Sequence, residues 1–322
     1  MLNASIRKTT SLLVAAGMAL GVSLGMAQAE YPEKPITMVI PLGPGGSHDL
    51  NARVITSVIP AYINQAMIVR LTPGAGGQKG THEVAKAPAD GYTLLFSHNY
   101  IDMLQQHVEK LPYDPKKDFI PIARINFAPI AVVVRGDSPH KTFEDLIAAA
   151  KAKPGGVSMA HSGNWGALFV PAAQMMKSRD VQFNLVPYKG GGPAMQALLS
   201  GDADVTMGFP ATIGSLLQSG KLRVLASSGP KRIYDDVPTF TEAGVVGDIG
   251  FMHRVVLVRS GTPDAVVKKL QDAFTALQGD KTYKNLLKRL GENADLMLGD
   301  EYQKMRDEQD VSYKALVEAI TN

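Results

Sequence analysis

Short apolar runs alternate with amphipathic segments along most of the chain. A short apolar run bounded by turn residues predicts a buried strand, and apolar positions that recur every three or four residues predict a helix. Strands are therefore expected at residues 36–41, 67–71, 92–96, 130–134, 157–160, 182–186, 205–207, 223–226 and 255–258. Helices are expected at residues 50–58, 78–86, 142–153, 167–177, 193–199, 213–218, 263–277 and 302–320, so that two helices close the chain.

The helix after residue 142 shows how such segments start and stop. Thr142 and Asp145 have the spacing of a capping box, and Phe143 and Leu146 begin an apolar face. Pro154 and the glycine after it stop the helix. Strands that alternate with helices in this way predict an α/β architecture with parallel, doubly wound sheets. At about 150 residues per domain, a chain of 322 residues predicts two domains.

The composition excludes several classes of protein. The chain has 45% hydrophobic residues, 20% charged residues and no cysteine, which excludes disulfide scaffolds, thiolate metal sites and cysteine nucleophiles. Of its 33 basic residues, Arg7 and Lys8 lie in a segment that we expect to be removed, which leaves 31 against 30 acidic residues. A charge so near neutrality gives no electrostatic reason to expect a nucleic acid or an anionic membrane as partner.

The first 29 residues have the pattern of a secretory signal peptide. Arg7 and Lys8 precede an uncharged stretch rich in Leu, Ala, Val and Gly, and Ala27 and Ala29 are the small residues of a cleavage site. We predict cleavage after Ala29 and a periplasmic location. The alternative is a membrane anchor, but the apolar stretch is short and interrupted by glycine.

Four glycine-rich loops each follow a predicted strand and precede a predicted helix, at residues 41–49, 73–81, 161–166 and 188–193. Glycine lets the backbone approach a ligand closely, and the unpaired N–H groups of the following helix attract anions. Such loops lie together at the carboxyl ends of parallel strands, which predicts a site for a carboxylate or a phosphate. The alternative is that they are tight turns that need glycine for chain geometry. None of them matches a dinucleotide-binding, phosphate-loop or nucleophile-elbow motif.

Several side chains in these loops allow two interpretations. Asp49 either caps a helix or binds a ligand amine, and Ser47 either caps a helix or donates to a carboxylate. Trp165 either stacks on a ligand or packs in the core, and Lys189 either attracts an anion or is a solvated lysine. No nucleophile with its base can be identified. No metal or cofactor is expected, because no metal-ligand spacing connects the histidines at positions 48, 98 and 161.

Ordered motifs run along the chain from Tyr31 to its C-terminus. They are Tyr31-Pro32-x-x-Pro35-Ile36, Pro41-x-Gly-Pro-Gly-Gly46-x-x-Asp49-x-x-Ala52-Arg53, Gly74-Ala75-Gly76-Gly77-x-x-Gly80, Pro88-x-Asp90-Gly91-Tyr92-Thr93, Leu111-Pro112-Tyr113-Asp114, Asp118-Phe119-x-Pro121, Pro187-Tyr188-Lys189-Gly190-Gly191, Val237-Pro238-Thr239-x-x-Glu242-Ala243-Gly244 and Gly261-Thr262-Pro263. Together they resemble one family, the periplasmic solute-binding receptors of tripartite tricarboxylate transporters, also called Bug receptors.

The resemblance implies two α/β domains, joined by crossover strands, that close like a hinge on a small carboxylate. Domain 1 would comprise residues 30–130 and 249–322, and domain 2 residues 131–248, after the signal peptide at residues 1–29. The protein would be a monomeric receptor and not an enzyme, and it would deliver a di-, tri- or aromatic carboxylate to a membrane permease. The implied ligand-binding residues are Leu42, Gly45, Gly46, Ser47, His48, Asp49, Gly76, Gly77, Ser162, Asn164, Trp165, Tyr188 and Phe209.

The chain departs from the family pattern at two places that border the expected cleft. The loop at residues 163–169 usually reads Gly-x-Gly-Ser followed by His, and here it reads Gly-Asn-Trp-Gly-Ala-Leu-Phe. The strand before Gly261 usually carries Trp, Gly and Ala-Pro-Ala, and here it reads His-Arg-Val-Val-Leu-Val-Arg-Ser. We hypothesise that Trp165 and Arg254 adapt the site to a distinct ligand. A receptor that presents its ligand to a sensor kinase, and a secreted enzyme that acts on a carboxylate or ester, are the alternatives.

Overall fold

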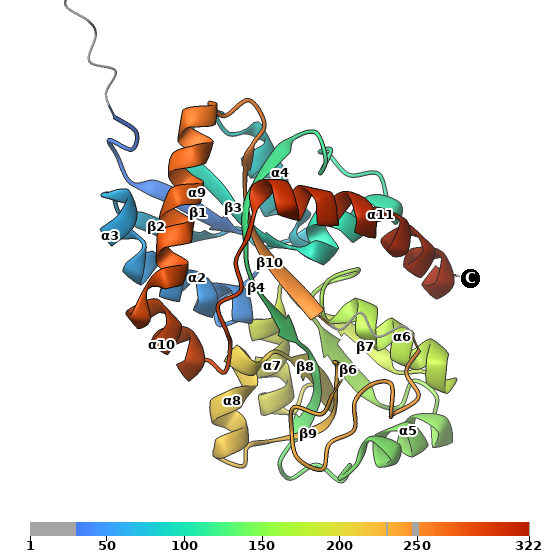
Figure 1. The fold of residues 1–322 in the computed structure, drawn as a ribbon. Coiled ribbons are helices and arrows are strands. Elements are labelled where there is room, and N and C mark those ends of the chain that lie inside the picture. Colours follow the sequence, from blue (N-terminus) through green and yellow to red (C-terminus); the bar gives the residue numbers. More distant parts are fainter. Residues whose placement is uncertain (1–29, 230, 247–250, 322) are drawn as a thin grey trace, which may run out of the picture. The chain divides into compact units, whose positions relative to one another are not determined.

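The strands are divided between two sheets, one built from both ends of the chain and one from its middle (Figure 1). The computed structural model describes residues 30–229, 231–246 and 251–321. The predicted signal peptide and the predicted boundary between residues 248 and 249 lie outside these residues. By their contacts, residues 34–322 form one unit that holds both sheets, so the predicted domain limits stay a prediction.

The six-stranded sheet has the order β11-β4-β10-β3-β1-β2. Its strands are β1 (Ile36–Ile40), β2 (Met67–Leu71), β3 (Thr93–His98), β4 (Phe119–Pro129), β10 (Phe251–Arg259) and β11 (Met297–Leu298). We call the part of the chain built on this sheet lobe 1. Its helices are α2 (Ser47–Val58), α3 (Pro60–Ile63), α4 (Gln78–Lys86), α9 (Asp264–Gly279), α10 (Lys281–Arg289) and α11 (Gly299–Thr321), with short turns η1 (Ala75–Gly77), η2 (Tyr100–Leu104) and η3 (Gln105–His107).

The five-stranded sheet has the order β7-β6-β8-β5-β9, and we call the part built on it lobe 2. Its strands are β5 (Ala131–Arg135), β6 (Ser158–His161), β7 (Asn184–Pro187), β8 (Val205–Gly208) and β9 (Leu222–Ser227). Its helices are α5 (Phe143–Ala152), α6 (Phe169–Arg179), α7 (Gly191–Ser200) and α8 (Pro210–Gln218). Side chains on the two faces of β5 belong to different hydrophobic clusters. Val132 and Val134 pack with residues of α5 and α6, whereas Ala131 and Val133 pack with residues of α7 and α8. Helices therefore cover both faces of this sheet.

The predicted α/β class is confirmed, but the prediction of parallel sheets holds only in part, because both sheets are mixed. In lobe 1, β1 is parallel to β2 and β3, whereas β10 is antiparallel to both β3 and β4. In lobe 2, β6 is parallel to β7 and β8, whereas β5 is antiparallel to β8 and β9. The reason is the connection between the lobes. Strand β4 continues almost directly into β5, and β10 returns beside β4 in the opposite direction, so this pair cannot be made of helical crossovers.

The elements that the sequence patterns missed include strands β4 and β11 and helices α3 and α10. Strand β4 contains Pro121 and Pro129, and proline weakens any strand prediction. In the structure Pro121 stands opposite Leu257, next to a shift of register in the β4–β10 ladder, where a missing N–H donor is tolerated. Helix α10 buries only Tyr283 and Leu287, too few apolar positions for a clear period. Three helices thus follow β10, and the prediction of two closing helices is wrong.

The local signals that predicted α5 are confirmed. The Thr142 hydroxyl accepts from the Asp145 N–H at 3.1 Å, and the Asp145 carboxylate accepts from the Thr142 N–H at 2.9 Å. The C-terminal helix α11 begins in lobe 1 and ends beside α6 of lobe 2, where Lys177 donates to the Ala319 carbonyl (Figure 1). The lobes are therefore linked by β4, by β10 and by this helix.

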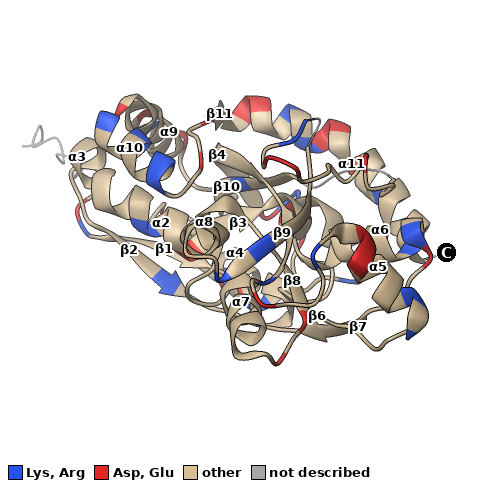
Figure 2. Ribbon diagram, turned by 90° about the horizontal axis from the view of Figure 1, so that it is seen from below, with Lys and Arg blue, Asp and Glu red and all other residues tan. Residues whose placement is uncertain are grey.

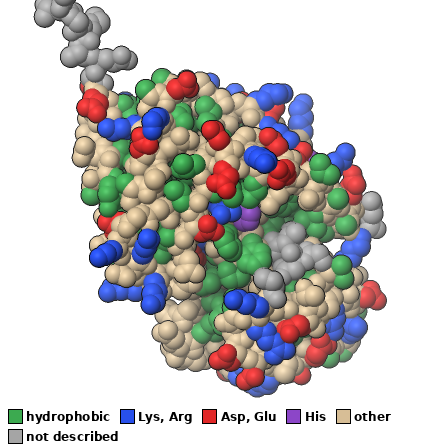
Figure 3. Space-filling model, viewed as in Figure 1, with side chains coloured by type: hydrophobic (Ala, Val, Ile, Leu, Met, Phe, Trp, Pro, Cys, Tyr) green, Lys and Arg blue, Asp and Glu red, His purple; other side chains and the backbone are tan. Residues whose placement is uncertain are grey.

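The surface carries both signs of charge. Lys and Arg alternate with Asp and Glu on the helices, without a broad area of one sign in either view (Figures 2 and 3). Within the part of the chain that the structure describes, no helix combines the length and apolarity needed to cross a bilayer. No three His, Asp or Glu side chains among these residues gather in a way that could hold a metal ion.

Candidate ligand-binding site

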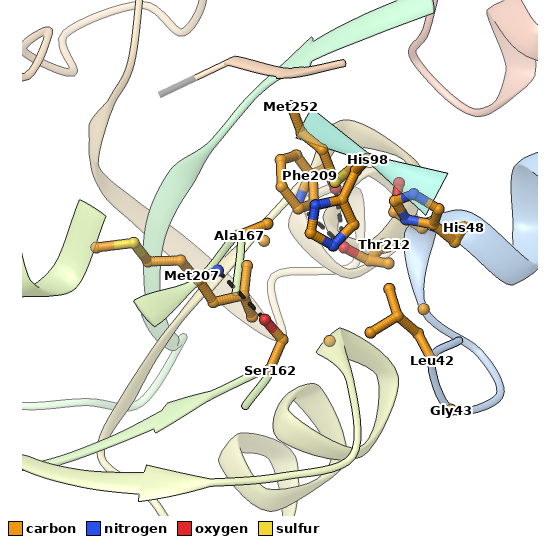
Figure 4. Close-up of a pocket in the computed structure, with 15 residues that line it drawn as sticks. Leu42, Gly43, His48, His98, Ser162, Ala167, Met207, Phe209, Thr212 and Met252 are labelled. Carbon is orange, nitrogen blue, oxygen red and sulfur yellow. Dashed lines mark hydrogen bonds between the residues drawn. The ribbon is translucent and has the colours of Figure 1, made fainter. Parts of the chain in front are cut away.

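All four glycine-rich loops meet at two adjoining cavities between the lobes. An inner cavity of about 20 Å³ and an outer one of about 400 Å³ share Leu42 and Ser162 in their walls. The inner cavity is also lined by Gly43, Gly46, Ser47, His48, His98, Ala167, Leu168, Gly191, Met207, Gly208, Phe209, Thr212 and Met252 (Figure 4). The outer cavity is also lined by Pro41, Gly74, Ala75, Gly76, Gly77, Gln78, Glu109, Gly163, Asn164, Pro187, Tyr188 and Lys189.

Glycines form the seam along which the lobes touch. The Gly43 N–H donates to the Lys189 carbonyl at 2.7 Å, which joins the first loop of lobe 1 to the last loop of lobe 2. A Cβ atom on Gly43 would lie 2.6 Å from that carbonyl oxygen, and one on Gly163 would lie 3.1 Å from the Cα atom of Gly76. Backbone therefore meets backbone across the seam, and this close approach requires residues without a side chain.

Three helices direct their N-termini at the inner cavity. Gly46 caps α2, Gly190 precedes α7 and Phe209 precedes α8, and no side chain accepts a bond from the first turn of any of these helices. A Cβ atom on Gly46 would lie 3.2 Å from the Gly192 nitrogen, so the ends of α2 and α7 lie against each other. Each end carries partial positive charge, and the first turns of α2 and α7 offer free N–H groups. In α8, Pro210 has no N–H and the Thr212 N–H donates to the Phe209 carbonyl at 2.8 Å. Since no Asp or Glu is among the lining residues described, the inner cavity favours an anion.

Two buried histidines form part of the wall without adding charge. The His48 Nε2 lies 3.2 Å from the Ser97 carbonyl, and the rings of His48 and His98 are 5.1 Å apart. Burial, assisted by the charge of Arg254, lowers the pKa of His98 to about 3. Burial, His98 and Arg254 lower the pKa of His48 well below its ordinary value. Both rings are therefore neutral near neutral pH, and in the described structure the His98 Nδ1 has no hydrogen-bond partner.

The remainder of the inner wall is apolar. Figure 4 shows Phe209 and Met252 beside the His98 ring, with Leu42 and Met207 on other sides of the cavity. The Thr212 hydroxyl is already engaged with the backbone of Phe209, because it donates to its carbonyl at 2.9 Å and accepts from its N–H at 3.2 Å. The cavity thus combines backbone donors with an apolar surround.

Ser47 is held from behind by a buried ion pair. Arg254, on β10, makes two bonds to Glu292, from Nη1 to Oε2 at 2.7 Å and from Nη2 to Oε1 at 2.9 Å. The same guanidinium donates to the Ser47 hydroxyl and to the Asn126 side chain. Arg254 is fully buried and does not line either cavity, so its charge is neutralised by Glu292 rather than exposed to a ligand.

Three predicted site residues are not among those that line the two cavities. Asp49 accepts from the Gly45 N–H at 2.9 Å and pairs with Arg53 at 2.9 Å, so its carboxylate fixes the loop rather than facing a ligand. Gly45 lines a separate surface hollow. The Trp165 ring packs on Phe169, with their centres 5.2 Å apart. The other ten predicted residues line one cavity or both.

The sequence patterns did not identify the cavity-lining residues that lie at or next to the ends of helices and strands. Ala167, Leu168, Met207 and Met252 are buried apolar residues, and a hydrophobic pattern assigns such residues to the core. Gln105 also escaped notice, although its side-chain amide donates to the Gly76 carbonyl at 2.9 Å and fixes the second glycine loop. Other wall residues outside the predicted set did have a signal, because they belong to the glycine-rich loops; among them are Gly43, Gly74, Ala75, Gly163, Lys189 and Gly191.

Comparisons with known proteins agree with this architecture. The sequence profile of the family described as "Tripartite tricarboxylate transporter family receptor" matches residues 51–321. The periplasmic binding protein BugD is 27% identical, with a TM-score of 0.86 over 90% of this chain and 99% of that chain. A Rhodopseudomonas palustris protein solved with adipate is 26% identical, with a TM-score of 0.85 over 91% and 99%. MatC of the same organism, solved with malate, is 26% identical, with a TM-score of 0.82 over 89% and 100%.

Proposed function

Because the chain belongs to the tripartite tricarboxylate transporter receptor family, whose members are periplasmic solute-binding proteins, we propose that it captures a small organic carboxylate for a membrane permease. The observation that carries the proposal is the convergence of three helix N-termini on one cavity. The ends of α2 and α7 offer backbone donors, the ends of all three helices offer partial positive charge, and the described wall of the inner cavity holds no acidic side chain. A carboxylate satisfies both properties.

The two cavities together suggest the size and the class of the ligand. The inner cavity has room for about one water molecule, so a carboxylate group can enter only if the lobes part and close again around it. The outer cavity of about 400 Å³ leaves space for the rest of a longer ligand beside Asn164, Tyr188 and Lys189. Relatives solved with malate and with adipate support dicarboxylates of different length as the first candidates.

The proposed mechanism is a population shift. A ligand that touches α2 of lobe 1 and α7 and α8 of lobe 2 binds the closed state more tightly than the open one. Strands β4 and β10, the antiparallel pair that joins the lobes, are the proposed hinge. The predicted signal peptide would bring the protein to the periplasm, where the closed form would deliver its ligand. The predicted monomeric state and the permease partner belong to this proposal.

A thermal-shift screen tests the carboxylate assignment. The protein is unfolded and refolded to remove trapped ligand, and malate, adipate, citrate, benzoate and terephthalate are added one by one. A ligand at about 100 times its Kd adds about 2.7 kcal/mol, which raises the unfolding temperature by about 5 °C or more. The matched control for each hit is its methyl ester, which keeps the carbon skeleton and lacks the negative charge. Shifts with the esters that equal those with the acids, or no shift with any acid, would contradict the proposal.

A further inference from the structure

A buried polar network joins the first turn of α2 to the two strands between the lobes. Arg254 stands opposite Asn126 of β4 and His98 of β3 in the ladder of β10. Its Nη1 donates to the Asn126 Oδ1 at 2.8 Å, and Asn126 in turn donates to the Asn51 Oδ1 at 3.2 Å. Asn51 completes the network by donating to the Ser47 carbonyl at 2.9 Å. Both the side chain and the backbone of Ser47 are therefore fixed by the network.

Glu292 provides the counter-charge and completes the bonding of Ser47. Its carboxylate accepts from Arg254 twice, from the Ser47 hydroxyl at 3.3 Å and from Asn126 at 3.1 Å. Arg254, Glu292 and Asn126 are buried, and none of the three lines either cavity next to the seam. The network therefore lies behind the cavity wall, in contact with the residue that begins α2.

The same network reaches the other lobe. The Arg254 guanidinium lies 5.8 Å from the centre of the Phe209 ring, within the range of a cation–π contact. Gly291, the neighbour of Glu292, approaches α8 so closely that a Cβ atom on it would lie 3.2 Å from the Pro210 Cβ. Phe209 and Pro210 form the N-terminus of α8, which is the contribution of lobe 2 to the inner cavity. One buried guanidinium thus contacts the cavity-lining ends of helices from both lobes.

We propose that the Arg254–Glu292 pair is a positioning device that holds the N-termini of α2 and α8 in the relative placement that binds the ligand carboxylate. This inference rests on the proposed function. Arg254 would not touch the ligand; it would act through Ser47 and Phe209. Arg254 also lies on β10, so movement of the proposed hinge would be transmitted directly to the two helix ends.

The energetics of buried ion pairs make a positioning role testable. Replacing both partners of such a pair by apolar residues of similar volume is often neutral for stability, because the cost of removing two charges from water offsets their attraction. A merely structural pair can therefore be replaced by Met at both positions without loss of function. A positioning pair cannot, because methionine has no donors or acceptors with which to fix Ser47.

The test compares ligand binding of the wild type with that of two double variants. In R254M/E292M, we expect the Kd for the tightest-binding carboxylate of the five-member panel to rise about tenfold. The matched control is D102L/R306M, which removes the second buried ion pair of lobe 1, joined at 2.6 Å and in contact with neither α2 nor α8. The control should bind within about twofold of the wild type. Kd is measured by calorimetry, and unfolding temperature is measured on the same samples.

Each outcome decides the question. An unchanged Kd in R254M/E292M, or an equal loss in both double variants, overturns the positioning role while the proposed function stands. A wild type that binds no member of the panel overturns the proposed function and this inference together. If R254M/E292M does not fold, R254K replaces it, since lysine keeps the charge but not the two-point contact. Wild-type affinity in R254K would then overturn the inference, and a weaker affinity that spares the unfolding temperature would support it.

Discussion

A single methyl group at the seam should separate folding from ligand binding. Gly43 contacts lobe 2 through its N–H group, and the three atoms nearest to a Cβ on Gly43 all belong to Lys189 and Pro193 of lobe 2. The change Gly43→Ala therefore adds a group that meets the other lobe only when the lobes are closed. Gly214→Ala is the matched control, because a Cβ there meets no atom of the described structure within 4 Å.

The size of the effect follows from the contact distance. The added Cβ would lie 2.6 Å from the Lys189 oxygen, about 0.7 Å closer than carbon and oxygen normally approach. Overpacking of this kind costs about 1–3 kcal/mol, and the cost falls on the closed state alone. The population of the binding-competent state falls by the same factor, so Kd should rise about fivefold to 150-fold. The free energy of unfolding of the empty protein should change by less than about 0.5 kcal/mol.

Calorimetric titration and urea unfolding together test this reasoning. The carboxylate that stabilises the wild type is titrated into the wild type, the Gly43→Ala variant and the Gly214→Ala variant under one set of conditions. We expect weak binding only in Gly43→Ala, an unfolding midpoint in Gly43→Ala similar to that of the wild type, and a slightly higher midpoint in Gly214→Ala, because alanine replaces glycine inside helix α8. If Gly43→Ala binds as tightly as the wild type, the ligand does not need this seam, and the link between closure and binding is refuted.

Three further changes probe the buried charges and the helix cap. The pKa of His98 is about 3 in the folded protein and near 6.5 in the unfolded chain, so its contribution to stability is complete above pH 6.5 and is lost by about 1.4 kcal/mol per pH unit below that pH. When the free energy of unfolding is measured by urea at pH 7, 6 and 5, it should change less with pH in His98→Gln than in the wild type. An equal change with pH in both proteins would contradict this reasoning. Arg306→Met leaves Asp102 buried without its partner and should lower the free energy of unfolding by about 3–5 kcal/mol. The control Lys268→Met, which breaks an exposed ion pair with Asp272, should lower it by less than about 0.5 kcal/mol. Thr142→Ala should cost about 1 kcal/mol of unfolding free energy, and a loss below a few tenths would show that the cap is dispensable.

The sequence predicted most elements because their periodicity reports burial directly. Strand β5 and helix α5 fall within a residue or two of their predicted limits, and the capping bonds at Thr142 are the ones that the spacing indicated. Strand β4 failed because pattern rules treat proline as a break, whereas a local shift of register accommodates it. Strand direction failed for a different reason, since an apolar run has the same appearance whichever way the chain passes through the sheet.

The candidate site was predictable only in part, because a loop motif shows that residues are special without showing what they contact. Asp49 has the family spacing, yet its carboxylate bonds Gly45 and Arg53. Arg254 departs from the family pattern and looked like a ligand contact, but its partner Glu292 is 38 positions away, and no local pattern can pair them. Long-range pairing of this kind depends on the fold as a whole.

The glycine-rich loops show why the two interpretations of their sequence were not true alternatives. A turn needs glycine for its own geometry, and a ligand site needs it for close approach, but Gly43 and Gly163 serve a third requirement, the contact of one lobe with the other. That contact brings the positive ends of α2 and α7 together, which is unfavourable unless an anion lies between them. The contact between the lobes and the ligand site therefore depend on the same glycine-rich loops. In the proposed mechanism, the glycines permit closure, and the ligand carboxylate makes closure favourable.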